Sequence, residues 1–171
     1  MLQLWAGESY ATTAAAFGLI TRIMTFLFLP LLGFSFAFQT IVGHNYGAGN
    51  AGRVALAVRI ALFAALGYCV MAEGLLIASR HSVGAMFVDD AGVIGEVARI
   101  LPMVIATLFL FGPQMMVATC FQAIGDAPRA GLLGLSRTYL FGLPLTGLLP
   151  FLLGEPGIWL AGPVAEICVL A

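Results

Sequence analysis

Apolar residues occur in long runs along the whole chain, and short polar segments separate the runs. A helix that crosses a membrane needs roughly 20 mainly apolar residues, because the hydrocarbon core is about 30 Å thick. The predicted spans cover residues 10–38, 54–79, 100–124, 130–153 and 158–171. The last run is too short for a full crossing. The pattern therefore predicts an all-α fold, a polytopic transmembrane helix bundle with about four full spans.

Glycine and proline mark the expected ends and bends of the spans. We expect a glycine-rich loop at residues 43–50 and a tight turn at residues 125–128. Pro30 lies inside the first run, where it can bend the helix. Residues 80–99 hold three acids and form the one long polar connection, which we expect to lie in water.

Both ends of the chain are expected to carry partial spans. Residues 1–5 resemble the end of an earlier helix, and residues 7–9 would form the turn that follows it. The run at 158–171 would be the start of a later helix. We therefore expect one transmembrane domain over residues 1–171.

The composition agrees with a membrane protein: 61% of the residues are hydrophobic and 9% are charged. Soluble domains have about 45–50% apolar and about 25% charged residues. Positive charge is scarce, since the chain has seven arginines and no lysine and its net charge is -1. No basic surface is available to neutralise phosphates, so we expect no nucleic-acid partner.

The arginines also predict an orientation, because loops that face the cytoplasm carry an excess of positive charge. Two arginines, Arg80 and Arg99, fall on the side of the long polar connection. Four fall on the opposite side, with the glycine-rich loop: Arg53, Arg59, Arg129 and Arg137. We therefore place the glycine-rich loop in the cytoplasm.

Three of the charged residues within the predicted spans are candidates for a functional role. The charge of Arg22 is energetically unfavourable inside the hydrocarbon core. Its side chain therefore either faces a polar cavity or reaches out to the membrane interface. Glu73 and Glu166 are candidates for binding a proton or a cation. Glu73 also fits an interfacial position, about 9 Å from the polar connection at 1.5 Å per residue. Glu166 lies further from a predicted loop, but in the incomplete last run.

Gln114 and Met115 are candidates for contact with a ligand. Gln114 follows Pro113, where a proline frees a backbone carbonyl. Its amide can instead form an ordinary hydrogen bond between helices. Met115 belongs to a group of methionines and phenylalanines that suits an adaptable hydrophobic pocket, and suits helix packing equally well.

The sequence contains no arrangement typical of an enzyme. The loop at 43–50 lacks the lysine and hydroxyl residue of a phosphate-binding loop, and His44 has no second metal ligand nearby. The three cysteines are far apart and lie in apolar runs. We expect no enzyme activity, no metal and no cofactor.

The segment Ile-Val-Gly-His-Asn-Tyr-Gly-Ala-Gly-Asn at 41–50, followed by Arg53, resembles the V-G-Q-N-x-G-A-G-[ND]-x-x-R signature of multidrug and toxic compound extrusion (MATE) transporters. Residues 14–23 and 121–129 resemble the helix before this signature and the turn after the family's tenth helix. The matching positions of the loop motif are Gly43, His44, Asn45, Gly47, Gly49 and Arg53. His44 replaces the usual glutamine.

The resemblance implies a twelve-helix transporter with two six-helix lobes, of which this chain covers most of the second. Such a protein lies in the cell membrane (inner or plasma membrane) and exports small hydrophobic or cationic compounds by alternating access. Inward flow of H⁺ or Na⁺ drives the export. The expected partners are the N-terminal lobe of the same transporter, the substrates, the coupling ion and the lipid bilayer.

The chain departs from the family at one place. Some members carry a coupling acid in the middle of the tenth helix, but residues 109–114 contain no acid. Other members place their coupling aspartate in the first lobe, so the resemblance assigns neither the ion nor its site.

Three other functions stay open at this point. A flippase for lipid-linked saccharides, from the same superfamily, would favour a cavity rich in cationic residues, but Arg22 is the one clear cation within a span. A membrane enzyme would need clustered His, Asp or Cys. A scaffold fragment without transport activity would need only the helix bundle.

Overall fold

The computed structural model describes residues 10–170, except for the side chains of Tyr10, Arg137, Thr138, Val169 and Leu170. These residues form helices without a strand, which confirms the predicted all-α fold. The elements are α2 (Tyr10–Gly47), α3 (Ala51–Ala78), α4 (Arg80–Val83), η2 (Gly84–Met86), α5 (Ala91–Ile105), α6 (Leu108–Ala123), α7 (Ala127–Leu135), η3 (Ser136–Gly142), α8 (Leu143–Leu153) and α9 (Glu155–Leu170).

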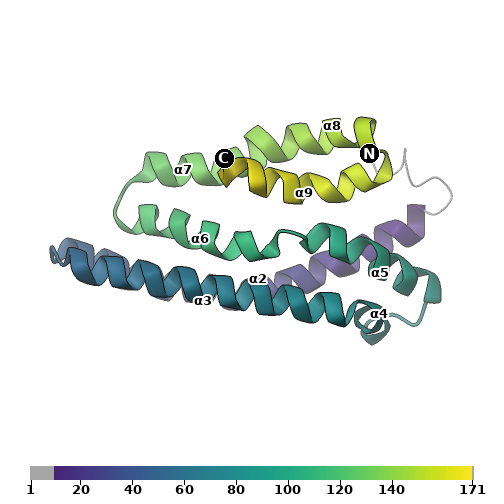
Figure 1. Cartoon of the computed structure of the whole chain (residues 1–171), viewed down its shortest axis with the longest axis horizontal. Helices are drawn as coiled ribbons and strands as arrows, with labels where there is room; N and C mark the ends of the chain where they lie inside the picture. Colours follow the sequence, from purple (N-terminus) through teal and green to yellow (C-terminus); the bar gives the residue numbers. More distant parts are fainter. Residues whose placement is uncertain (1–9, 171) are drawn as a thin grey trace.

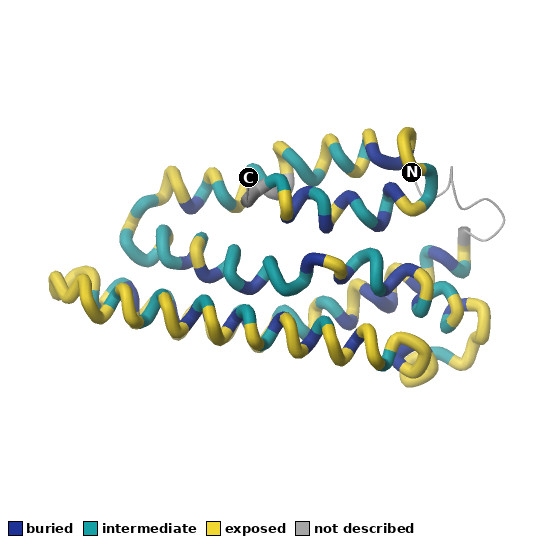
Figure 2. The backbone as a smooth tube through the Cα atoms, viewed as in Figure 1, coloured by how far each residue is buried: buried dark blue, intermediate teal, exposed yellow. Residues whose placement is uncertain are grey.

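The helices form three layers in the view of Figure 1: α2 with α3, then α5 with α6, then α7 and α8 with α9. The middle layer packs on both neighbours, since α6 lies along α3 and α5 contacts α2 and α9. Buried residues of α3 lie along one side and exposed apolar residues along the other (Figure 2). An apolar exposed face is what contact with lipid requires.

Three described helical segments are long and apolar enough to cross a membrane: 11–47, 51–78 and 127–153. Helices α5 and α6 make a fourth span if the bent pair is taken as one, with an angle of 45° between them. The chain is therefore a multi-pass membrane bundle.

The glycine-rich segment does not form the long loop that we expected. Helix α2 continues through Pro30 and ends only at Gly47, so the turn comprises three residues, 48–50. Gly43 and Gly47 are part of α2, where backbone N–H and C=O groups can form the hydrogen bonds of the helix. Gly49 alone needs a special conformation, with φ at 72°. Prediction of a loop over residues 43–47 was wrong.

The expected polar connection at 80–99 is also shorter than predicted. The Asp90 side chain accepts hydrogen bonds from the backbone N–H groups of Gly92 and Val93, at 2.8 and 3.4 Å, and so caps the start of α5. Helix α5 then buries Val93 and Val97 well before the predicted start of the span at residue 100. The acidic residues of this segment had suggested a loop, but one of them, Asp90, caps the start of α5.

The two glycine turns lie at the same end of the bundle, and the α4 and α8–α9 turns lie at the other (Figure 1). Arg53 and Arg129 follow the two glycine turns, whereas Arg80 and Arg99 belong to the opposite end. The predicted orientation, with the glycine-rich segment in the cytoplasm, depends on this separation of the arginines between the two ends of the bundle.

Candidate functional site

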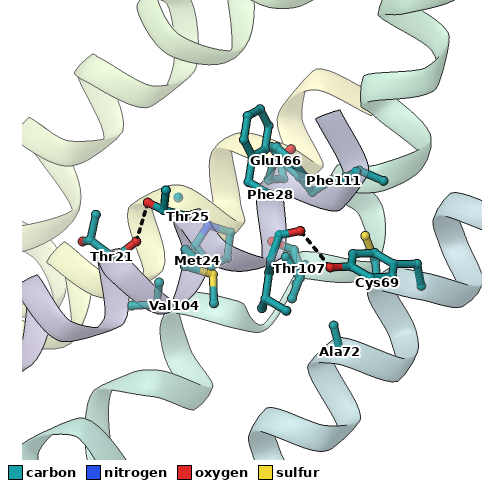
Figure 3. Close-up of a pocket in the computed structure, with 16 residues that line it drawn as sticks. Thr21, Met24, Thr25, Phe28, Cys69, Ala72, Val104, Thr107, Phe111 and Glu166 are labelled. Atoms are coloured by element: carbon teal, nitrogen blue, oxygen red, sulfur yellow. Dashed lines mark hydrogen bonds between the residues drawn. The ribbon is translucent and has the colours of Figure 1, made fainter. Parts of the chain in front are cut away.

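A cavity of about 420 Å³ opens between α2, α3, α9 and the junction of α5 with α6. Figure 3 shows side chains from these elements pointing toward it. The residues that line the cavity come from several helices that are far apart in the sequence. Cavities between helices of a bundle are common places for a ligand.

Aromatic and aliphatic side chains form most of the cavity wall. The rings of Phe28 on α2 and Phe111 on α6 meet edge to face, with their centroids 5.8 Å apart. Tyr68 on α3 donates its hydroxyl to the Leu27 carbonyl over 2.9 Å, so the polar tip of this ring already has a partner. The wall therefore offers mainly apolar and π surface to a ligand.

Three threonines contribute hydroxyl groups to the cavity wall, two from α2 and one from the α5–α6 junction (Figure 3). Thr21 and Thr25 are one helical turn apart on α2, and each donates to the carbonyl four residues earlier, at 2.9 Å. Thr107 lies at the α5–α6 junction and is 8% exposed. A hydroxyl oxygen that donates its hydrogen keeps lone pairs, so these groups can accept hydrogen bonds from a ligand.

Glu166 on α9 is the one carboxylate among the described residues that line the cavity. It is 6% exposed, and its backbone carbonyl accepts a 2.9 Å hydrogen bond from Nε2 of Gln114. The structure thus brings two of the predicted site residues together across α6 and α9. Because Glu166 lines the cavity, a cationic group inside the cavity can approach this residue.

Glu73 belongs to α3 and does not line the cavity. Its carboxylate lies beside the start of α6. Its Oε2 atom accepts a 3.0 Å hydrogen bond from the backbone N–H of Phe109, although the two residues are 36 positions apart in sequence. The side chain is half-buried. Glu73 therefore supports the junction of α5 and α6.

Glu166 is the one predicted candidate among the described lining residues, so Gln114, Met115 and Arg22 lie outside the cavity wall. Met115 packs against the core formed between α2, α3 and α6. Arg22 is exposed on α2, on a side of the helix that does not line the cavity. Within the described part of the chain, Arg22 makes no hydrogen bond or ion pair.

The loop motif builds the turn between α2 and α3. Asn45 donates its side-chain amide to the Ile41 carbonyl at 2.8 Å, and its own carbonyl accepts from the Asn50 N–H at 2.9 Å. A Cβ atom on Gly43 would lie 3.5 Å from the Ala123 carbonyl, so this glycine faces the end of α6. His44, Gly47 and Arg53 are exposed.

Sequence reasoning missed most of the cavity wall. The spacing of Thr21 and Thr25 inside an apolar run is a signal that could have been used, because residues four apart share a helix face. Phe28, Tyr68 and Thr107 gave no such signal. Their place in the wall depends on how separate helices pack.

Among residues 10–170, no group of three or more His, Cys, Asp or Glu side chains could hold a metal ion.

Comparison with protein families identifies the chain. The MatE family model matches residues 1–148. The chain belongs to the MatE family. No solved structure matches it.

Several curated proteins are similar to this MatE chain. Protein DETOXIFICATION 53 of Arabidopsis thaliana is 30% identical over 86% of the chain and 31% of its own length. Multidrug and toxin extrusion protein 2 of Mus musculus is 29% identical over 96% of the chain and 28% of its own length. An uncharacterized transporter of Schizosaccharomyces pombe is 28% identical over 93% of the chain and 30% of its own length. The MatE chain thus spans under a third of these relatives' length.

Proposed function

We propose that this chain forms part of a secondary active exporter of hydrophobic, often cationic compounds, in exchange for H⁺ or Na⁺. The observation that supports this function is the apolar, aromatic cavity with the buried carboxylate of Glu166. Family membership and relatives named for transport or for toxin extrusion support it too. The proposed location is the inner or plasma membrane.

Glu166 would couple the ion to the substrate by exchange. When ionised, its carboxylate attracts a cationic group, and the rings of Phe28 and Phe111 add cation–π and apolar contact. When a proton or another cation occupies it, that attraction is lost and the substrate is released. One site that holds either ligand but not both gives antiport.

The exporter would need a second lobe to enclose its substrate path. Arg22 supports this view, because a charge at the lipid-facing centre of a helix costs about 2.5–3.5 kcal/mol or more. An exposed arginine on α2 is better placed against the N-terminal lobe of the transporter, or in a water-filled space between the lobes. Alternating access would then move the two lobes against each other.

The decisive variant is Glu166→Gln in the full-length transporter. We expect efflux of a cationic dye to fall on the order of tenfold or more, because the amide keeps the shape of the side chain but removes its charge. Asp89→Asn is the matched control, since Asp89 is exposed between η2 and α5. Dye efflux is measured at equal expression under an imposed H⁺ or Na⁺ gradient.

Wild-type efflux by Glu166→Gln under both gradients would contradict the assigned role of Glu166. A full-length protein that exports no dye under any gradient would support a membrane scaffold instead. The flippase alternative is weakened by the cavity itself, because none of its described lining residues is an arginine or lysine.

A further inference from the structure

The bent span formed by α5 and α6 contains a helix start within the bundle. Helix α5 ends at Ile105 and α6 begins at Leu108, with a 45° bend between them. The first N–H groups of a helix have no partner inside the helix. Thr107 occupies the capping position, but its side chain makes no capping hydrogen bond. The Leu110 N–H donates to the Thr107 carbonyl at 3.0 Å, so the Phe109 N–H is the one that bonds to a group outside the helix.

The carboxylate of Glu73 does this from the neighbouring helix. Its Oε2 atom accepts from the Phe109 N–H, the second residue of α6, at 3.0 Å. A carboxylate suits this position because the N-terminus of a helix carries a partial positive charge. In the hydrocarbon core no water replaces a lost partner, so an unsatisfied N–H group is unfavourable there.

Close packing of α3 and α6 fixes the carboxylate in place. A Cβ atom on Gly112 would lie 2.7 Å from Cys69 Sγ and 2.8 Å from the Ala65 carbonyl, so the two helices nearly touch there. Glu73 follows Cys69 by one helical turn, and Phe109 precedes Gly112 by about one turn. The glycine contact therefore sets the distance between the carboxylate and the start of α6.

We propose that Glu73 is a positioning residue that fixes the α5–α6 junction, and through it one wall of the cavity. Thr107 and Leu108 line the cavity and directly precede Phe109. Loss of the negative charge would loosen the first turn of α6 and displace these two residues. The effect on transport rests on the proposed exporter function; the effect on the junction does not.

Hydrogen–deuterium exchange of the full-length transporter in lipid nanodiscs tests the junction directly. We expect Glu73→Ala to speed exchange in peptides covering residues 106–112 on the order of tenfold or more, since a hydrogen bond to a charged group is lost. Glu73→Gln should give an intermediate increase, because the amide oxygen accepts without the charge. Glu96→Gln, an acid-to-amide change on α5 away from the junction, should leave these peptides unchanged.

Protection of α3 peptides shows that each variant is folded. With that protection intact, wild-type exchange at the junction in Glu73→Ala overturns the proposal. If Glu73→Ala does not fold, Glu73→Gln decides: faster exchange supports the role of the charge, and wild-type exchange overturns it.

Transport kinetics test the link to the cavity. We expect Glu73→Gln to raise the KM for a cationic dye severalfold with little change in maximal rate, because the wall moves but Glu166 stays. An unchanged KM overturns that link. Glu166→Gln should not alter exchange at the junction, so failure of the proposed exporter function and failure of the Glu73 role give different results.

Discussion

Two carboxylates inside apolar helices lie in different surroundings here. Glu73 binds a backbone N–H group at a helix start, and its partner belongs to the fold. Glu166 borders a cavity in which a mobile cation can approach it. Sequence alone put both in the same class, because each is an acid in an apolar run. Only the packing of neighbouring helices separates a structural acid from a candidate ligand-binding acid.

Single glycines also differ in what they contribute. Gly49 has φ at 72°, in the left-handed region, whereas Gly52 is helical and has open space around it. We expect Gly49→Ala to destabilise the transporter by about 1 kcal/mol or more, and Gly52→Ala to stabilise it by about 0.4–1 kcal/mol. Thermal unfolding midpoints in detergent measure both. Equal midpoints for the two variants would show that the turn tolerates a side chain.

At the scale of elements, helix α3 packs so closely on α6 that no side chain fits at Gly112 without a shift of its neighbours. Small residues on α3 form a stripe that faces inward: Ala61, Ala65, Cys69 and Ala72, continued by Leu76. Such stripes let membrane helices approach closely. Gly112 on α6 sits where the approach is tightest.

We expect Gly112→Ala to force α6 away from α3. The added methyl group would meet backbone atoms of Ala65, which cannot yield as a flexible side chain would. Overpacking of this kind costs about 1–3 kcal/mol. Gly67→Ala is the control, because Gly67 lies in α3 with nothing near its Cβ position. A similar unfolding midpoint for both variants would argue against the tight contact.

The sequence predicted the all-α membrane bundle, because long apolar runs can be recognised from neighbouring residues alone. It could not predict the α5–α6 junction. Pro113 was the visible signal in that span, yet α6 continues through Pro113 and the bend lies at Ala106 and Thr107. The acceptor that makes this bend acceptable, Glu73, is remote in sequence. The sequence identified Glu73 and Glu166 as candidate acids. It could not identify the residues that contact them, because those residues are far away in the sequence.

At the scale of the whole molecule, one ionic contact connects the middle and outer layers. Arg99 on α5 pairs with Glu96 at 2.7 Å and also with Glu155 at the start of α9. The arginine side chain is 41% exposed, so solvent screens both pairs. Exposed pairs of this kind contribute about 0–1 kcal/mol. The contact aligns α9 with α5 more than it stabilises the bundle.

We expect Arg99→Ala to lower the unfolding midpoint slightly at low salt. The difference from wild type should shrink in about 1 M salt, where screening acts over about 3 Å. Arg80→Ala is the control, since Arg80 is exposed on α4 and contacts only His81 among the described residues. A difference that does not change with salt would indicate that Arg99 acts through packing instead.

The position of Glu166 on α9 has a consequence for how the protein is made. The ribosome synthesises α2, α3, α5 and α6 before α9, because they precede it in the sequence. Most of the cavity wall is therefore synthesised before Glu166, the one carboxylate among the described residues that line it. Glu166 thus joins a space whose lining already includes the hydroxyl groups of Thr21, Thr25 and Thr107.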